Sequence, residues 1–250
     1  MGIIKLETQH ISKSYAGVLI IKDINVRLGE NELVSLLGVS GIGKSTLFNV
    51  IAGVLQPDSG RVLLNGEDIT GQAGKVSYMQ QKDLMQRHMT VLDNIALPLF
   101  IRGIPKRQAR DQALSYFADF GLEGTEKMYP AQLSGGMRQR GALLRTYLFS
   151  QEVALFDEPF SALDAITKSA MHWWYLDLMY RLNMSTLFIT HDIDEAILMS
   201  DRVYIMTGPP GEIAHEIIID MPRPRGDDFL VSDTFLGYKR QIIKLLDNKR

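Results

Sequence analysis

Cysteine is absent from the 250-residue sequence. This absence excludes disulfide scaffolds, cysteine-ligated zinc, iron–sulfur clusters and thiol catalysis, and it fits a reducing cytoplasm. Charge of one sign is not in excess either, because 27 lysine and arginine residues stand against 29 aspartate and glutamate residues, a net charge of -2. A dominant cationic face is therefore disfavoured, and no nucleic-acid partner is expected.

A long apolar run is missing as well. The nearest candidate, residues 95–101, is far shorter than the ~18–20 apolar residues that a membrane-spanning helix needs. Residues 1–7 lack the charged-then-apolar pattern of a signal peptide. We therefore expect any role at a membrane to require a separate membrane protein. Hydrophobic residues still make up 46% of the sequence, enough for a sizeable core in one large or two modest domains.

Two strand patterns predict two kinds of sheet. Residues 3–7 and 18–28 alternate polar and apolar side chains, which is typical of a half-exposed antiparallel sheet. Residues 33–37 form a short apolar run, typical of a strand buried on both faces of a parallel sheet. Further strands are expected at residues 76–79, 153–156, 185–190 and 203–206, and helices at 44–54, 165–182 and 193–199. This alternation predicts an α/β fold with a mostly parallel sheet.

Residues 82–130 interrupt the alternation. They carry helical patterns at residues 91–101 and 105–120 and no strand-like run. We therefore expect a helical subdomain, at about residues 82–145, inserted into the α/β core.

The C-terminal part of the chain reads as a separate tail. Residues 222–226 are rich in proline and arginine, which is typical of a linker, and residues 229–246 are expected to form a terminal helix. The expected organisation is a main domain over residues 1–226 and a helical tail over residues 227–250.

A phosphate-binding loop follows the buried strand. Residues 38–46, Gly-Val-Ser-Gly-Ile-Gly-Lys-Ser-Thr, match the pattern G-x-x-x-x-G-K-[ST] between a predicted strand and a helix. Glycines let backbone N–H groups converge on phosphate oxygens, and the positive end of the helix adds to the attraction. Lys44 is expected to reach the β- and γ-phosphates, and Ser45 to ligate Mg²⁺. The predicted nucleotide-binding residues here are Gly38, Ser40, Gly41, Gly43, Lys44, Ser45 and Thr46.

Two acidic residues, Asp157 and Glu158, directly follow the strand expected at residues 153–156. Ligands of open α/β sheets lie at this end of the strands. Asp157 suits the Mg²⁺ role, and Glu158 can orient or deprotonate a water that attacks the γ-phosphate. The alternative is that Asp157 caps a helix that begins with Pro159.

Between these motifs, residues 133–140 read Leu-Ser-Gly-Gly-Met-Arg-Gln-Arg. Gly135 and Gly136 at a helix start would form a second anion-binding site, with Ser134 as an added donor. This segment resembles the signature motif of ATP-binding-cassette (ABC) ATPases, and the order of the three motifs is that of the family. The resemblance extends from about Lys13 to Met206. It implies a P-loop NTPase core that binds and hydrolyses ATP with Mg²⁺.

The resemblance implies roles for further positions. Tyr15 matches the aromatic residue that stacks on adenine, with an ordinary strand tyrosine as the alternative. Gln81 matches the glutamine that contacts Mg²⁺ and the attacking water. It is chosen over Gln80 because its spacing to residues 90–94 fits the family. Asp164 matches the loop that crosses a dimer interface, and His191 the histidine that contacts the γ-phosphate. The catalytic residues implied are Glu158, His191, Gln81 and Lys44, and the metal ligands are Ser45, Gln81 and Asp157.

The resemblance also implies partners and a place in the cell. It indicates the ATPase subunit of a bacterial importer, paired head to tail with a second copy. Such a subunit lies in the cytoplasm on the inner face of the membrane, bound to a separate permease and only indirectly to a solute-binding protein. The motifs look like those of the nitrate, sulfonate and taurine group, in which the solute differs between members.

One departure from the family pattern concerns the partner. Importers of this type often carry Leu-Pro-Trp where this sequence has Gln86, Arg87 and His88. Three alternatives to an importer subunit stay open, namely an exporter ATPase, a soluble cassette protein of DNA repair or translation, and a catalytically silent regulatory subunit.

Overall fold

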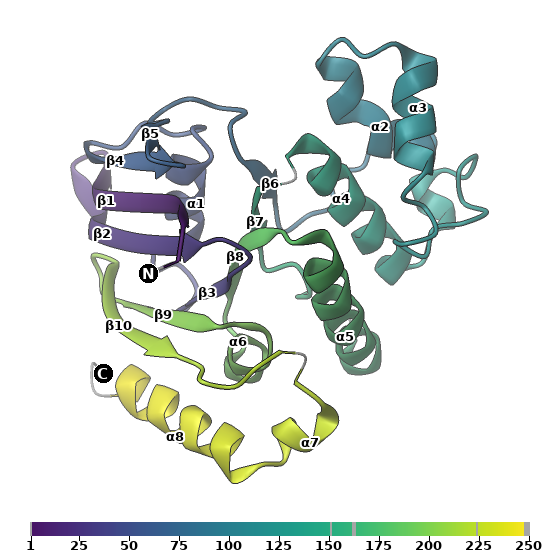
Figure 1. The fold of residues 1–250 in the computed structure, drawn as a ribbon. Coiled ribbons are helices and arrows are strands. Elements are labelled where there is room, and N and C mark those ends of the chain that lie inside the picture. Colours follow the sequence, from purple (N-terminus) through teal and green to yellow (C-terminus); the bar gives the residue numbers. More distant parts are fainter. Residues whose placement is uncertain (1, 151, 162–163, 224, 248–250) are drawn as a thin grey trace.

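The computed structural model describes residues 2–150, 152–161, 164–223 and 225–247. Two sheets form the body of the protein (Figure 1). The first is antiparallel with the strand order β2-β1-β4-β5. Its strands are β1 (Ile4–Tyr15), β2 (Val18–Gly29), β4 (Ser59–Leu64) and β5 (Glu67–Asp68). Alternate residues of β2, including Ile24, Val26 and Leu28, are buried, so one face of this sheet covers a core.

The second sheet has the strand order β10-β9-β3-β8-β7-β6. Its strands are β3 (Leu33–Leu37), β6 (Ser77–Met79), β7 (Val153–Asp157), β8 (Ser185–Thr190), β9 (Arg202–Thr207) and β10 (Glu212–Ile218). The five strands from β9 to β6 are parallel, and β10 adds an antiparallel edge. The carboxyl ends of β3, β6, β7 and β8 therefore meet at one edge, where α/β proteins bind ligands.

Helices cover both faces of the parallel sheet. Helix α1 (Lys44–Ile51) packs with the antiparallel sheet over one face, where Val34 and Leu36 of β3 point. The other face receives Leu33 and Leu37 and is covered by α5 (Ala165–Leu182) and α6 (Ile193–Met199). This arrangement of two sheets and flanking helices confirms the predicted fold class.

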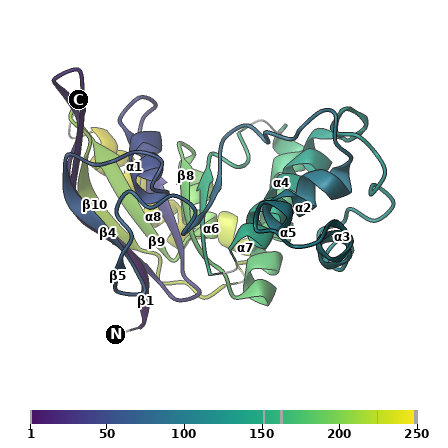
Figure 2. The same cartoon turned by 90° about the horizontal axis from the view of Figure 1, so that it is seen from above.

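Three helices lie together on one side of the sheets (Figure 2). They are α2 (Val91–Ile101), α3 (Lys106–Leu114) and α4 (Gly135–Phe149), and η1 (Pro130–Gln132) precedes the last of them. Thr90 caps α2 by accepting a hydrogen bond from the Asp93 backbone. The Asp93 carboxylate then accepts two bonds from Arg110, at 2.6 and 2.7 Å, which fastens α3 to α2. The helix expected at residues 105–120 is shorter in the structure, because turns follow Leu114.

The C-terminal segment differs from the single helix expected at residues 229–246. It forms α7 (Asp227–Leu230) and α8 (Asp233–Asp247). Ser232 separates them, because its hydroxyl accepts a hydrogen bond from the Phe235 backbone and so starts a new helix. Helix α8 packs on α6. Among the described residues, no helix combines the length and apolar character that crossing a membrane requires.

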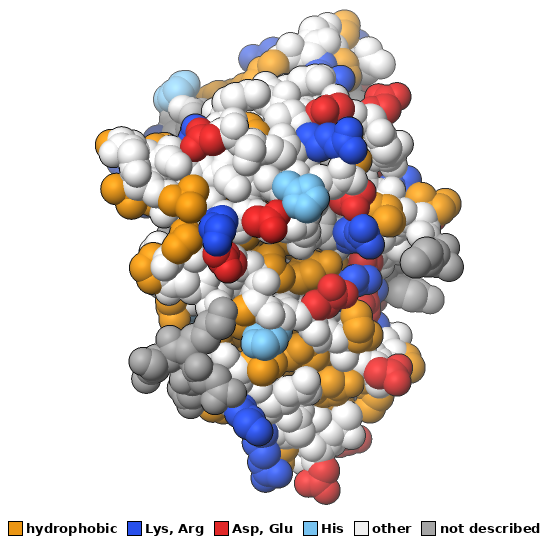
Figure 3. Space-filling view, turned by 90° about the vertical axis from the view of Figure 1, so that its left-hand side faces the viewer, with side chains coloured by type: hydrophobic (Ala, Val, Ile, Leu, Met, Phe, Trp, Pro, Cys, Tyr) orange, Lys and Arg blue, Asp and Glu red, His pale blue; other side chains and the backbone are white. Residues whose placement is uncertain are grey.

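One face of the protein carries acidic and basic side chains close together (Figure 3). On the face shown in Figure 3, lysine and arginine side chains are interspersed with aspartate and glutamate, and apolar side chains lie between them. This distribution agrees with the balanced charge of the sequence.

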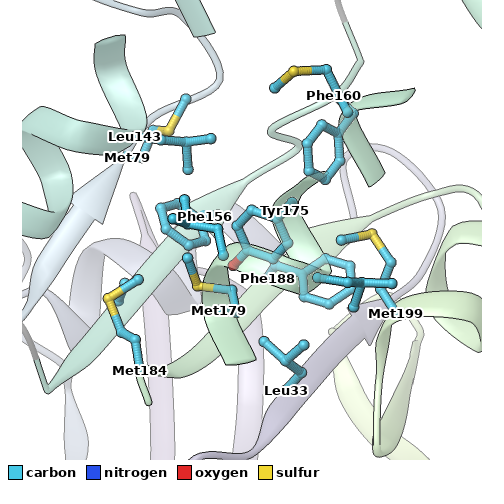
Figure 4. Close-up of a cluster of buried hydrophobic side chains, with 14 of the residues drawn as sticks. Leu33, Met79, Leu143, Phe156, Phe160, Tyr175, Met179, Met184, Phe188 and Met199 are labelled. Carbon is cyan, nitrogen blue, oxygen red and sulfur yellow. The ribbon is translucent and has the colours of Figure 1, made fainter. Parts of the chain in front are cut away.

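The larger core lies between the parallel sheet, α4, α5 and α6, and it is rich in methionine (Figure 4). Phe156 of β7 and Phe188 of β8 pack there with Tyr175, and Phe156 and Tyr175 meet edge to face at 5.7 Å. The flexible side chain of Met179 lies among these rings, and Met184 belongs to the same cluster at its margin. This core holds β7 and β8 together, and so fixes the positions of the residues at their carboxyl ends.

Candidate functional site: a nucleotide cleft at the sheet edge

The loop between β3 and α1 has a backbone that only glycine fits at three positions. Gly41 and Gly43 have φ values of 81° and 107°, in the left-handed region. A Cβ atom on Gly43 would lie 2.5 Å from Ile21, and one on Gly38 would lie 2.7 Å from the Met206 carbonyl oxygen. The loop therefore packs closely against β2 and β9, and it leads directly into the first turn of α1.

Lys44 opens α1 and folds back over this loop. Its Nζ donates hydrogen bonds to the carbonyl oxygens of Gly38, at 2.6 Å, and Val39, at 3.0 Å. Burial lowers the pKa of Lys44, and the carboxylates of Glu158 and Asp157 oppose that shift. A buried ammonium group at a helix N-terminus is suited to an anionic ligand such as a phosphate.

Asp157 ends β7 and is buried, with 8% of its surface exposed. Burial raises its pKa, while hydrogen bonds from Ser45 and Tyr78 and the charge of Lys44 act in the opposite direction. The helix-cap alternative for Asp157 is excluded, because the next helix is α5, which Asp164 caps.

The carboxylate of Asp157 and the hydroxyl of Ser45 fit a divalent cation. They are neighbouring hard oxygen ligands, which Mg²⁺ prefers. A cation would also relieve the cost of a buried carboxylate. Sequence reasoning missed Tyr78, whose hydroxyl lies 3.4 Å from Asp157, although the parallel alignment of β6 with β7 would have placed it nearby.

Glu158 stands directly after Asp157 in a left-handed conformation with φ 49°, which is uncommon for a residue with a side chain. Gln81 Nε2 donates to Glu158 Oε2 at 3.2 Å, and His191 Nδ1 lies 3.2 Å from Glu158 Oε1. The Glu158 backbone N–H donates to the Ile189 carbonyl on the neighbouring strand. The carboxylate is thus held between a side chain that follows β6 and one that follows β8.

The phosphate loop, Gln81 and Glu158 share a cleft of about 340 Å³. Its lining residues are Ile20, Ser40, Gly41, Gly43, Lys44, Ser45, Thr46, Gln81 and Glu158. Tyr15 lies at the end of β1 with 46% of its surface exposed, and Lys13 Nζ lies 6.0 Å from its ring centre. The stacking role of Tyr15 stays a prediction.

A second cleft, of about 400 Å³, lies between the starts of α4 and α5. Ser134 caps α4 by accepting a hydrogen bond from the Met137 backbone at 3.2 Å. Asp164 caps α5 by accepting bonds from the backbone and hydroxyl of Thr167. Gly135 and Gly136 line this cleft with them, and among the described residues the two clefts share no lining residue.

The loop between Gln81 and α2 is fixed by Asn94, which is fully buried. Its Oδ1 accepts from the Gln86 backbone N–H at 2.6 Å, and its Nδ2 donates to the carbonyls of Gln86, Met89 and Thr90. Gln86 and the following residues 87–88 are exposed at the surface.

A family model described as ABC transporter matches residues 21–161, more than half of the chain. The chain belongs to the ABC transporter family. It is 44% identical over 191 residues to the formylaminopyrimidine import ATP-binding protein ThiZ of Halalkalibacterium halodurans, covering 76% of this chain and 74% of that protein. It is 37% identical over 240 residues to the nitrate import ATP-binding protein NrtD of Synechocystis sp., covering 94% of this chain and 89% of that protein.

A solved structure extends the similarity. The dimeric structure of a post-hydrolysis state of the ATP-binding cassette MJ0796 bound to ADP and Pi has a TM-score of 0.73 and 25% sequence identity, covering 87% of this chain and 100% of that one. The family recognised from the sequence is therefore confirmed, and this ABC protein is an ATPase that binds ATP.

In this ABC ATPase, the sequence-predicted residues fall into two groups. The phosphate loop, Asp157, Glu158, Gln81 and His191 meet at the carboxyl edge of the parallel sheet. The signature residues and Asp164 line the separate cleft.

Proposed function

We propose that this chain is the ATP-hydrolysing subunit of a bacterial importer that works with a separate permease. The observation that carries the proposal is the placement of the Glu158 carboxylate between Gln81 and His191, next to the phosphate loop. This arrangement suits the in-line attack of water on a γ-phosphate, a reaction catalysed mainly by positioning and charge stabilisation.

In the proposed reaction, Lys44 and the backbone N–H groups of the phosphate loop bind the phosphates. Asp157, Ser45 and Gln81 would hold Mg²⁺, which would supply positive charge to the phosphate oxygens. Glu158 orients the attacking water and accepts its proton. Gln81 and His191 hold the Glu158 carboxylate and contact the water or the γ-phosphate, and Tyr15 stacks on adenine.

Two copies are proposed to pair head to tail. The phosphate-loop cleft carries the lysine and the two carboxylates, while the signature cleft carries glycines at a helix start in the same chain. Facing clefts from two copies would surround each ATP with both sets of groups. The solved cassette with similar structure is itself a dimer.

The import role is supported by the relatives, which are named for formylaminopyrimidine and nitrate import. We propose a small solute of the nitrate, sulfonate or taurine type, or a related one, delivered to the permease by a solute-binding protein. The ATPase domain spans residues 1–226 with the helical subdomain at about 82–145, and residues 227–250 form a tail. The chain acts in the cytoplasm, on the inner face of the cell membrane.

The test is purification of the tagged full chain from membranes of its host, followed by mass spectrometry and ATPase assay. We expect an integral permease to co-purify, and we expect hydrolysis to be lost in the matched Lys44→Ala variant. Recovery without a permease, but with nucleic acid or ribosomal proteins, would instead favour a cassette protein of DNA repair or translation.

A further inference from the structure

A cluster of polar side chains surrounds the residues that flank His191, between α5, β8 and α6. Its members are Lys168 and His172 of α5, Thr190 of β8, Asp192, and Glu195 of α6. His172 and Glu195 are buried, with 7% and 5% of their surfaces exposed. Because buried polar groups are costly unless they are paired, each of these groups needs its partners.

The cluster fixes the residues on both sides of His191. Before it, the Thr190 hydroxyl donates to Glu195 Oε2 at 2.5 Å. After it, the Asp192 backbone N–H donates to the Thr190 hydroxyl at 3.0 Å. Asp192 Oδ1 also accepts from the backbone N–H groups of Asp194 and Glu195 and so caps α6. The backbone of His191 is therefore set by Thr190, Asp192 and Glu195 together.

Lys168 joins these carboxylates to α5. Its Nζ lies 2.7 Å from Asp192 Oδ2 and 3.6 Å from Glu195 Oε2. Although burial acts against the charged form, the bond to Asp192 and the charge of Glu195 outweigh it and raise the pKa of Lys168. On the other side of Glu195, His172 Nε2 lies 3.2 Å from Oε1.

The same lysine stands one helical turn after the cap of α5. The Lys168 backbone N–H donates to the Asp164 carbonyl at 2.8 Å. A cavity of about 80 Å³ separates the cluster from the catalytic edge, and Lys168, Glu195, His191 and Glu158 all line it. Lys168 thus connects the start of α5 to the His191 loop. Its backbone bonds to Asp164, and its ammonium group pairs with Asp192 and Glu195.

We infer that Lys168 is a positioning residue for ATP hydrolysis, which acts through Asp192 and Glu195 to hold His191 against Glu158. The inference rests on the proposed roles of Glu158 and His191. Removing the ammonium group leaves the carboxylates of Asp192 and Glu195 without their shared cation, so the His191 loop shifts. Small misplacements of a catalytic group cost up to ~10²-fold in rate, because reacting groups must be held in the right geometry.

The experiment measures kcat and the KM for ATP of the full chain. For Lys168→Met we expect kcat to fall by about tenfold while the KM for ATP changes by less than about twofold, since positioning is lost and phosphate binding is not. Lys168→Arg, which can still pair with both carboxylates, should recover most of the rate. The matched control is Lys239→Met. Lys239 of α8 also pairs with a carboxylate of α6, that of Asp194 at 2.8 Å, but it does not contact Asp192 or Glu195 in any described bond. We expect Lys239→Met to hydrolyse ATP at the wild-type rate.

A double-mutant comparison separates this inference from the proposed function. In a His191→Ala background, Lys168→Met should cause no further loss of kcat. Wild-type turnover by His191→Ala would overturn the proposed role of His191. If His191→Ala is impaired while Lys168→Met is not, or if the two losses multiply, the inference is overturned and the proposed function stands. Should Lys168→Met fail to fold, Asp192→Asn is expected to show the same loss of kcat, and wild-type turnover by that variant would overturn the inference.

Discussion

The phosphate-loop cleft and the signature cleft are assembled from different structural parts. The first gathers side chains from the ends of neighbouring parallel strands, so that Gln81 and Glu158 meet at 3.2 Å although 77 positions separate them. The second is built from two helix starts, capped by Ser134 and Asp164, on the side of the molecule where α2 and α3 lie. The sheet edge thus carries the charged groups proposed to act in hydrolysis, while the two helix starts form a separate cleft.

The two regions also differ in how they hold a carboxylate, which is buried at Asp157 and partly buried at Asp93. In the catalytic region, burial raises the pKa of Asp157, which is the condition of a group that awaits a cation. In the helical region, hydrogen bonds from Arg110 lower the pKa of Asp93, which is the condition of a group already paired. The pKa directions therefore agree with the proposed metal-binding role of Asp157 and with a stabilising ion pair at Asp93.

The largest expected effect is on the catalytic carboxylate. Glu158→Gln should keep ATP binding but lower turnover by ~10²–10⁴-fold, because a positioned base is lost. The loss of negative charge should also prolong the ATP-bound dimer. Steady-state hydrolysis and size-exclusion chromatography with ATP check both outcomes. Hydrolysis within a few-fold of wild type would remove Glu158 from its proposed role.

Sequence patterns predicted several strands and helices around the sheet edge well, because the signals of single elements are local. The strand Leu33–Leu37 and the helices Ala165–Leu182 and Ile193–Met199 have the bounds expected from periodicity. The expected strand at 153–156 is also present and continues to Asp157. The resemblance to the ABC family then picked out Glu158, Gln81 and His191, whose meeting depends on the order of strands that are distant in sequence.

The features that the sequence did not reveal depend on contacts between distant segments. Strand β4 begins at Ser59, inside the stretch Pro57-Asp58-Ser59-Gly60, whose composition is typical of a turn. The edge strand β10 pairs antiparallel with β9, and its residues are mostly half exposed. The cluster around Lys168 joins three elements, so no short window of sequence displays it. Each of these features is defined by contacts with a strand or helix that is distant in sequence, so the local residue pattern does not predict it.

The next largest effect tests whether the two clefts complete each other. Lys44→Ala disables the phosphate loop, and Gly135→Asp places a negative charge in the signature cleft, so each variant alone should be inactive. In a head-to-tail dimer, a mixture restores one site in each mixed pair, so an equal mixture should recover about a quarter of wild-type activity. ATPase assays on the mixture, with subunit exchange verified by two affinity tags, measure this. Exchange without any recovery would show that the clefts do not act across a dimer.

A smaller effect is expected at the exposed loop before α2, where we propose that the chain contacts a permease. Arg87 is exposed in the segment that departs from the family pattern. Arg87→Glu should weaken co-purification of the permease by about tenfold, because a charge at the rim of an interface alters association. ATP binding by the isolated chain should not change. Arg240→Glu is the matched control, since Arg240 is exposed on α8. Equal permease yields from both variants would show that Arg87 is ordinary surface.

The smallest effect sharpens the contrast between the carboxylates of Asp157 and Asp93, and thermal unfolding across a pH series measures it. Asp157→Asn should stabilise the nucleotide-free protein at neutral pH by about 1 kcal/mol, because it removes a buried charge. That gain should disappear as the pH falls through the raised pKa of Asp157, where the native carboxyl is already neutral. Asp93→Asn should instead destabilise the protein by about 1 kcal/mol, because Arg110 loses its partner.

The Asp93 effect has the opposite sign, and it too disappears in acid. A lowered pKa contributes stability above the unfolded-state value of roughly 4, and this stability is lost as the pH falls through the folded-state pKa. The penalty of Asp93→Asn should therefore be full at neutral pH and vanish in acid. Destabilisation by Asp157→Asn at neutral pH would contradict the distinction, since it would make Asp157 a structural partner of Ser45 and Tyr78 rather than a carboxylate held ready for a cation.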